Sequence, residues 1–333
     1  MKGMGGRRIL ISPLNWGFGH AGRMIPLAAE LKRRGHEVHF GVDKSLIPMV
    51  RGELPGISIT EIRGVRIRYS RHLPQYLCIF LQLPSITVSS VSEYYHLRRL
   101  ASRLQPDLII SDSRFGFRHR NIPSVYVTHQ LRIAFPGWLR LMEPLGVWIH
   151  SMIIRRFDLC LVPDYPGSVN LSGRLSHDLP LPDNTCYCGP LSRFDATPAT
   201  AAGRELPRRP FCCLILSGPE PQRTMLLHKV TAAVTEMPLV ILSAAPLHDK
   251  PTGNRKITVI TSPDTATMKR YLIEAERIIA RAGYTAIMEL ASLGRGAILI
   301  PTPGQTEQEY LGRYLHGRLG FVTVSQGEIG PAL

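Results

Sequence analysis

The chain has 333 residues, of which 44% are hydrophobic and 20% charged, and its formal net charge is +15. At roughly 150 residues a domain, this length predicts two domains, each apolar enough to build its own core. The six cysteines show no CxxC pair and no disulfide-like spacing, so we expect reduced thiols in a cytoplasmic protein. We also expect no signal peptide and no membrane-spanning helix. These features argue against a disulfide-rich secreted protein and an integral membrane protein.

The positive charge is uneven, with a larger excess of Lys and Arg before about residue 185 than after it. Anionic lipid, a diphosphate-bearing acceptor and nucleic acid could each complement such a surface. No nucleic-acid motif is visible, so we expect no nucleic-acid partner. The stretches Arg63–Tyr76 and Pro136–Arg156 mix Arg with Tyr, Leu, Ile and Trp. Each can lie on an anionic membrane at its inner face, or pack as a helix with a solvated basic face.

The first half of the chain alternates predicted strands with predicted helices, as a Rossmann-type α/β domain does. The predicted strands are 8–14, 37–42, 57–62, 107–111, 122–128 and 159–162, and the predicted helices are 24–34, 94–104 and 138–157. An apolar stretch at 73–91 is interrupted by prolines, and residues 164–209 are expected to be loop. We therefore predict an N-terminal domain at 1–188 and a linker at 189–209.

The second half repeats this alternation over residues 210–333, the predicted C-terminal domain. The predicted strands are 211–216, 239–243, 257–260, 278–280 and 297–300, and the predicted helices are 222–234, 265–275, 287–293 and one opening at 305–309. Such βαβ units require a parallel sheet with right-handed crossovers. Ligands of open parallel sheets bind outside the carboxyl ends of the strands. Residues 281–289 and 302–308 are expected there.

The residues of this second region carry a family resemblance. Arg281, Gly283, Thr285 and Glu289, followed by Pro301, Glu307 and Gln308, resemble the donor-nucleotide site of GT-B glycosyltransferases. The likeness is greatest to the transferase that adds N-acetylglucosamine to the peptidoglycan lipid precursor. The resemblance implies an α/β fold of two Rossmann-like domains facing across a cleft. It also implies that Glu289 holds the ribose and that Glu307 and Gln308 meet the donor sugar. Alternatively, these carboxylates are ordinary helix charges.

A loop after the predicted strand 211–216 is a candidate for the donor diphosphate. Ser217, Gly218, Arg223 and Thr224, with backbone N–H groups at a helix start, can hold phosphate oxygens. Two prolines in the loop remove N–H donors, and Arg223 can compensate with its charge. The alternative is an ordinary strand–helix connection.

The candidate acceptor site lies in the first half. Gly17 and Gly19 form a loop that permits close approach of a ligand. His20 resembles the family histidine that faces the acceptor, and it can take the hydroxyl proton or merely cap the helix. Asp112 ends a predicted strand, where it can be the base, orient His20, or cap a turn. His129 also ends a strand and can line the acceptor side or be structural.

The predicted function is an inverting glycosyltransferase. It would move a hexose or N-acetylhexosamine from a nucleotide diphosphate sugar, with UDP expected, to a hydroxyl acceptor that can be lipid-linked. No DxD motif or metal-ligand spacing is present, so we expect no metal and no cofactor. A nucleotide-sugar epimerase, a non-catalytic nucleotide-sugar or lipid-binding subunit, and a nicotinamide enzyme remain as alternatives, the last disfavoured by an incomplete glycine fingerprint. The GT-B resemblance implies a terminal helix that returns to the first domain, and we expect either that this helix is absent or that the sequence is truncated.

Overall fold

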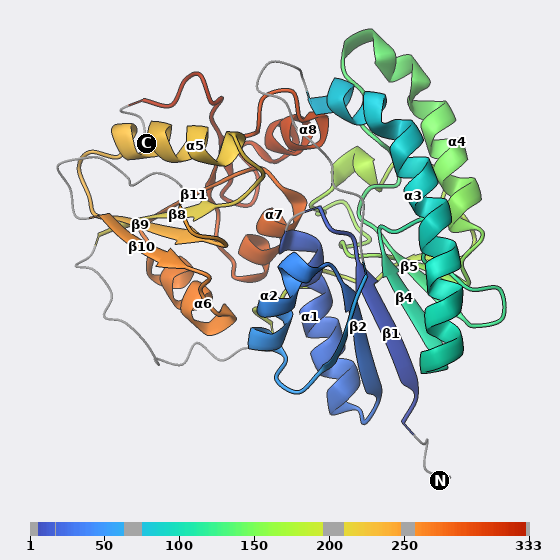
Figure 1. Ribbon diagram of the computed structural model, residues 1–333. Helices are drawn as coiled ribbons and strands as arrows, with labels where there is room; N and C mark the ends of the chain where they lie inside the picture. The colour runs from blue at the N-terminus through green and yellow to red at the C-terminus, as the bar shows by residue number, and fades with distance from the viewer. Residues whose placement is uncertain (1–5, 17, 63–74, 196–209, 248–256, 331–333) are drawn as a thin grey trace. The chain divides into compact units, whose positions relative to one another are not determined.

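The computed structural model describes residues 6–16, 18–62, 75–195, 210–247 and 257–330. The chain divides into two compact units (Figure 1): residues 1–67 with 79–191, and residues 68–78 with 192–333. Each unit is a parallel sheet with helices, so the predicted α/β class is confirmed. Residues 196–209 of the predicted linker and residues 63–74 of the first aromatic-basic stretch lie outside the described residues, so both assignments stay predictions.

The first unit contains a seven-stranded sheet in the order β3-β2-β1-β4-β5-β6-β7. Its strands are β1 (Arg8–Pro13), β2 (Glu37–Val42), β3 (Ser58–Glu61), β4 (Leu108–Asp112), β5 (Ser124–Val127), β6 (Leu159–Val162) and β7 (Thr185–Tyr187). Its α-helices are α1 (Phe18–Arg33), α2 (Ile47–Glu53), α3 (Gln75–Leu104) and α4 (Glu143–Ile154), with the short 3-10 helices η1 (Lys44–Leu46), η2 (Gly137–Met142) and η3 (Gly173–Leu175). All the paired strands run parallel, which places their carboxyl ends at one edge.

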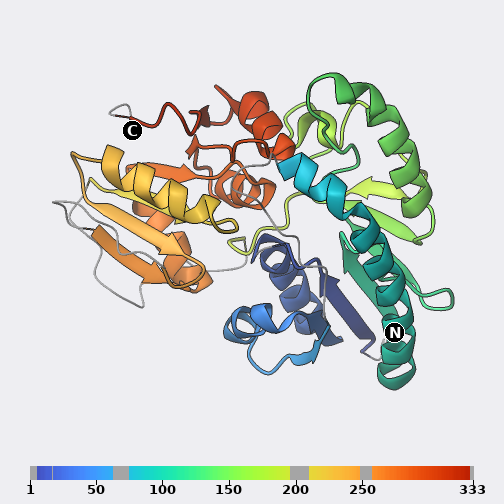
Figure 2. The same cartoon turned by 45° about the horizontal axis from the view of Figure 1, so that its top comes forward.

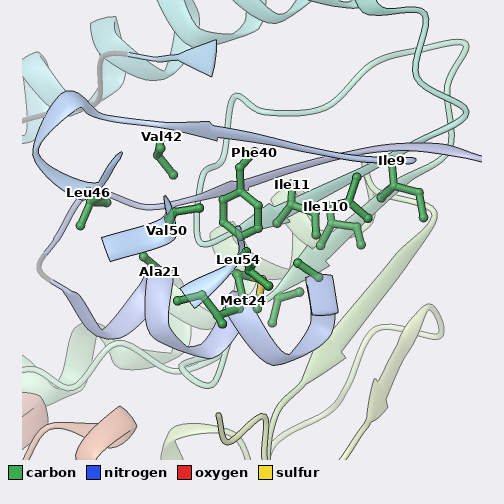
Figure 3. Packing of buried hydrophobic residues seen from close by; sticks show 14 of the residues in the cluster. Ile9, Ile11, Ala21, Met24, Phe40, Val42, Leu46, Val50, Leu54 and Ile110 are labelled. Atoms are coloured by element: carbon green, nitrogen blue, oxygen red, sulfur yellow. The ribbon is translucent and has the colours of Figure 1, made fainter. Parts of the chain in front are cut away.

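The core of the first unit follows from the alternation of side chains along β1. Ile9 and Ile11 point to the face covered by α1 and α2, whereas Leu10 packs on the opposite face with residues of α3. Figure 3 shows Phe40 projecting from β2 toward Met24 of α1. Because both faces of the central strands are covered, those strands contain continuous apolar runs.

Three local predictions for the first unit were wrong. The helix α1 begins at Phe18, so Gly19 and His20 belong to its first turn instead of a loop. The helix α3 runs unbroken through Pro84, which is exposed, so water can satisfy the backbone carbonyl that loses its partner. The strand β7 lies in a stretch predicted to be loop, because three residues are too few to show an alternating pattern.

The second unit contains a six-stranded parallel sheet in the order β10-β9-β8-β11-β12-β13. Its strands are β8 (Cys212–Leu216), β9 (Leu239–Ser243), β10 (Ile257–Thr261), β11 (Arg277–Ala280), β12 (Ile298–Leu299) and β13 (Val322–Thr323). Its helices are α5 (Gln222–Ala233), α6 (Thr265–Glu274), α7 (Tyr284–Ser292) and α8 (Thr306–Leu315). Figures 1 and 2 show α5 and α6 on opposite faces of this sheet. Among the described helices, none is long and apolar enough to cross a membrane.

Candidate functional site

His20 and Asp112 meet at the carboxyl edge of the first sheet. His20 lies in the first turn of α1, directly after β1, and Asp112 is the last residue of the neighbouring strand β4. The backbone N–H of Leu14 donates to the Asp112 carbonyl at 2.9 Å, which ties the two strand ends together. The Nδ1 atom of His20 is 3.1 Å from Oδ2 of Asp112. The two candidate catalytic residues therefore form one pair, with 17% of the His20 side chain exposed and Asp112 fully buried.

Arg23 is the residue that the sequence analysis missed. It lies one turn after His20 on α1 and is fully buried. Its Nε donates to Oδ2 of Asp112 at 3.0 Å, and its Nη2 donates to Oδ1 of the same carboxylate. Its Nη1 is 2.9 Å from Nδ1 of His129, so all three predicted polar residues of this edge contact one guanidinium. The spacing of His20 and Arg23 could have indicated this contact, because residues three apart on a helix lie on the same face.

The electrostatics of this cluster separate the roles of its members. Burial alone would raise the pKa of Asp112, but the charges and hydrogen bonds of Arg23 and His20 outweigh it and hold that pKa well below its usual range. Asp112 is therefore ionised and a weak base. The arrangement favours an orienting role for Asp112, and it leaves His20 as the group suited to accept a proton.

Of the two glycines predicted to form the acceptor loop, the structure describes only Gly19. Gly17 lies outside the described residues, and Gly19 is part of the first turn of α1. His129 follows β5 and is 8% exposed, with its ring at the same edge as His20. The geometry thus brings together His20, Asp112 and His129 through Arg23.

In the second unit, Glu289 is buried and already ion-paired. It lies on α7 with 4% exposed, and its Oε1 accepts a hydrogen bond from Nε of Arg193 at 2.8 Å. The same guanidinium approaches Oε2 of Glu289 at 3.4 Å. A carboxylate oxygen has two acceptor positions, so ribose hydroxyls would share this group with Arg193 or displace it.

Arg281 supports the backbone of the second sheet. Its guanidinium is 2% exposed and donates to the carbonyls of Gln222 at 2.8 Å, Ile300 at 3.2 Å and Pro301 at 3.4 Å. Burial lowers the pKa of Arg281 to about 10, which still leaves it charged at neutral pH. Its contacts therefore join the ends of β11 and β12 to the start of α5.

The predicted phosphate loop contains an anion of its own. Gly218 follows β8 with a φ of +104°, a conformation that glycine adopts easily. The Glu220 carboxylate accepts from the backbone N–H of Thr224 at 3.1 Å and pairs with Nε of Arg223 at 3.2 Å. Arg223 also donates to the Pro246 carbonyl at 2.5 Å. Glu220 thus engages two of the donors that we assigned to a diphosphate, the Thr224 N–H and Arg223.

The other predicted donor residues lie at helix starts. Gly283 is the N-cap of α7, and Thr285 is in its first turn, half-buried. Glu307 is in the first turn of α8. The Gln308 side-chain carbonyl accepts from the Thr302 N–H at 2.9 Å, which leaves its amide N–H groups to meet a ligand. All four lie beyond the carboxyl ends of β11 and β12, where the resemblance puts the donor.

A separate surface of the first unit combines apolar and basic side chains. The helix α4 exposes Leu145, Trp148, Ile149 and Met152, a stripe of apolar side chains at helical spacing. A groove of about 580 Å³ lies beside this stripe. Its lining includes the side chains of Arg132, Arg140, Val147, Trp148, Arg155 and Leu181.

Comparison with known proteins adds a family match and a set of similar folds. Residues 243–331 match the model of the glycosyltransferase family 28 C-terminal domain. An uncharacterized glycosyltransferase of Methanosarcina mazei is 24% identical over 321 residues, covering 91% of this chain and 82% of the relative. One of Methanosarcina acetivorans is 24% identical over 330 residues, covering 91% and 81%.

Solved structures share the fold over nearly the whole chain. The glycosyltransferase of kitacinnamycin has a TM-score of 0.67 at 15% identity, covering 98% of this chain and 88% of that one. The spinosyn rhamnosyltransferase SpnG complexed with thymidine diphosphate has a TM-score of 0.66 at 18% identity, covering 95% and 86%. By its two Rossmann-like sheets, the family model that matches residues 243–331 and the glycosyltransferases it is similar to, the chain is a glycosyltransferase with the GT-B fold.

Proposed function

We propose that this glycosyltransferase moves a hexose or N-acetylhexosamine from a nucleotide diphosphate sugar to a hydroxyl acceptor, with inversion and without a metal ion. His20 is the base, oriented by Asp112. The observation that carries this proposal is the 3.1 Å contact between His20 Nδ1 and Asp112 Oδ2. With the Nδ1 proton held by the carboxylate, Nε2 of His20 has the lone pair that a general base needs.

The chemistry is a single displacement at the anomeric carbon. The acceptor oxygen forms its bond to that carbon as the bond to the donor phosphate oxygen breaks, and the hydroxyl proton passes to His20. The nucleotide diphosphate leaves with the bonding electrons. Donors at the start of α5 would stabilise it once Glu220 gives up the Thr224 N–H and Arg223.

The similar solved structures add candidate donors and acceptors to the UDP-linked sugars and lipid-linked hydroxyls that the sequence suggested. Two structural relatives are complexes with thymidine diphosphate, so thymidine-linked sugars join UDP-linked sugars as candidates. One is a complex with spinosyn aglycone, which makes small hydroxylated aglycones candidates beside lipid-linked hydroxyls. The exposed apolar stripe on α4, flanked by arginines, supports contact with an anionic membrane surface that would carry a lipid-linked acceptor.

Calorimetric titration without metal tests the donor half of the proposal. Wild type would be titrated with UDP, thymidine diphosphate, UDP-N-acetylglucosamine and NADH, beside Glu289→Ala and the surface control Glu328→Ala. We expect micromolar binding of one nucleotide that is lost in Glu289→Ala and kept in Glu328→Ala. Binding of NADH alone would support the nicotinamide alternative. Conversion of the bound sugar nucleotide without an acceptor would support an epimerase.

A further inference from the structure

Arg23 connects the candidate base, its carboxylate and a second histidine from a fully buried position. We propose that Arg23 is the positioning residue of this site: it sets the charge that His20 meets and fixes which ring nitrogen of His129 carries a proton. The proposal rests on the proposed function, in which His20 is the base. It concerns the state of the two imidazoles before any substrate binds.

The state of His129 follows from the chemistry of its partner. A guanidinium has only donors, and Nη1 of Arg23 lies 2.9 Å from Nδ1 of His129. The Nδ1 atom must therefore offer its lone pair. His129 then carries its proton on Nε2 and is not a second base.

The net charge beside His20 is set by the bidentate ion pair between Arg23 and Asp112. Two nitrogens of Arg23 hold the two oxygens of Asp112, and both side chains have no exposed surface. This bidentate pair carries no net charge. A bare buried carboxylate 3.1 Å from the ring would stabilise an imidazolium, which cannot accept a proton. Arg23 thus balances the charge of Asp112 while Asp112 still orients His20.

The number of hydrogens on Nη2 of Arg23 bears on which tautomer of His20 can act as a base. This nitrogen has two hydrogens, and the acceptors within its reach include Oδ1 of Asp112, Oγ of Ser113 at 3.3 Å and Nδ1 of His20 at 3.0 Å. A bond to His20 Nδ1 would force the ring proton onto Nε2 and block the base. When Ser113 accepts the second hydrogen, His20 keeps its proton on Nδ1 and donates it to the Asp112 carboxylate.

Two other titratable groups of the first unit, Tyr126 and Cys188, interact with this cluster and are neutral at working pH. Burial raises the pKa of the Tyr126 hydroxyl well above its ordinary value, and burial raises the pKa of the Cys188 thiol to about 11. Both groups interact electrostatically with Arg23. Among the described residues, the charged side chains within hydrogen-bond distance of His20 are those of Arg23 and Asp112.

Nuclear magnetic resonance of protein labelled with 15N-histidine tests this without any substrate. Long-range proton–nitrogen correlation reports the tautomer and titration of each of the 12 histidines. His20→Asn and His129→Asn assign the two signals. We expect wild-type His129 to be the Nε2–H tautomer. The comparison for His20 is between Asp112→Asn, which leaves Arg23 unbalanced, and the double variant Arg23→Met with Asp112→Asn, which carries neither charge.

The His20 titration midpoint should lie about one pH unit or more lower in Asp112→Asn than in the double variant. Arg23→Met alone, if it folds, should titrate above wild type. The double variant leaves no buried charge unpaired and is the safer one to fold. Coinciding midpoints, or an Nδ1–H tautomer of His129 in wild type, would overturn the proposal. A purely structural Arg23 would lower the melting temperature without moving the midpoints. If the midpoints move but His20→Ala still transfers sugar, the base assignment fails while the role of Arg23 stands.

Discussion

Replacing Arg281 with methionine separates a structural role from direct contact with the donor. The side chain is buried and its guanidinium serves three backbone carbonyls, at 2.8, 3.2 and 3.4 Å. A charged hydrogen bond contributes about 1.5–3 kcal/mol to stability. Counting the shortest bond in full and the 3.2 Å bond in part, we expect Arg281→Met to destabilise the second unit by about 3 kcal/mol.

The chain offers an internal reference for this measurement. Its three tryptophans, Trp16, Trp138 and Trp148, all lie in the first unit, so tryptophan fluorescence follows that unit while far-UV circular dichroism follows both. In denaturant, the circular dichroism transition should move to lower concentration and the fluorescence transition should stay. Arg295→Met is the matched control, because Arg295 donates to two carbonyls from a half-buried position and should cost about 1 kcal/mol or less. An Arg281→Met protein that unfolds like wild type but no longer binds nucleotide would refute the reasoning.

Three further predictions concern other groups. Glu220→Gln removes a charge that competes for the phosphate donors, so UDP should bind about fivefold tighter by calorimetry, and weaker binding would contradict the assignment. Replacing Trp148 and Ile149 with serine should reduce sedimentation with anionic vesicles and leave nucleotide binding unchanged; unaltered sedimentation would place the membrane contact elsewhere. Burial lowers the pKa of His150 to about 4, so below pH ~6.5 the unfolded chain binds more protons than the folded one. The free energy of unfolding of the first unit should therefore fall by up to about 3 kcal/mol by pH 4. His150→Gln should remove this part of the loss, as measured by fluorescence-detected unfolding.

The sheet elements were predictable because their signals are local. The run Ile278–Ala280, the glycines that follow and the apolar helical spacing define β11 and α7 from neighbouring residues alone. Asp112 was found because residues at the ends of parallel strands collect at one edge. This rule depends only on where a strand ends in the sequence, and Asp112 is indeed the last residue of β4.

The partners of the site residues could not be predicted, because they come from distant parts of the sequence. Arg23 lies on a helix that reads as amphipathic, and its buried partners Asp112 and His129 are 89 and 106 residues away in the sequence. Glu289 was expected to be open to a ribose, but its ion pair with Arg193 spans 96 residues. Arg281 was assigned to the donor, and its contacts with carbonyls depend on the packing of α5 on the sheet.

The central claim is sugar transfer with His20 as the base, and product formation tests it most directly. Purified enzyme would be incubated with UDP- and thymidine-linked sugars and a panel of lipid-linked and small hydroxyl acceptors, with mass spectrometry of the products. His39→Gln is the control, since His39 lies on β2 and its side chain forms a hydrogen bond with Thr60 and not with Asp112. The account predicts a glycosylated acceptor with inverted anomeric configuration in wild type and His39→Gln, and a rate at least about 100-fold lower in His20→Ala. Undiminished transfer by His20→Ala, or retention of configuration, would contradict it.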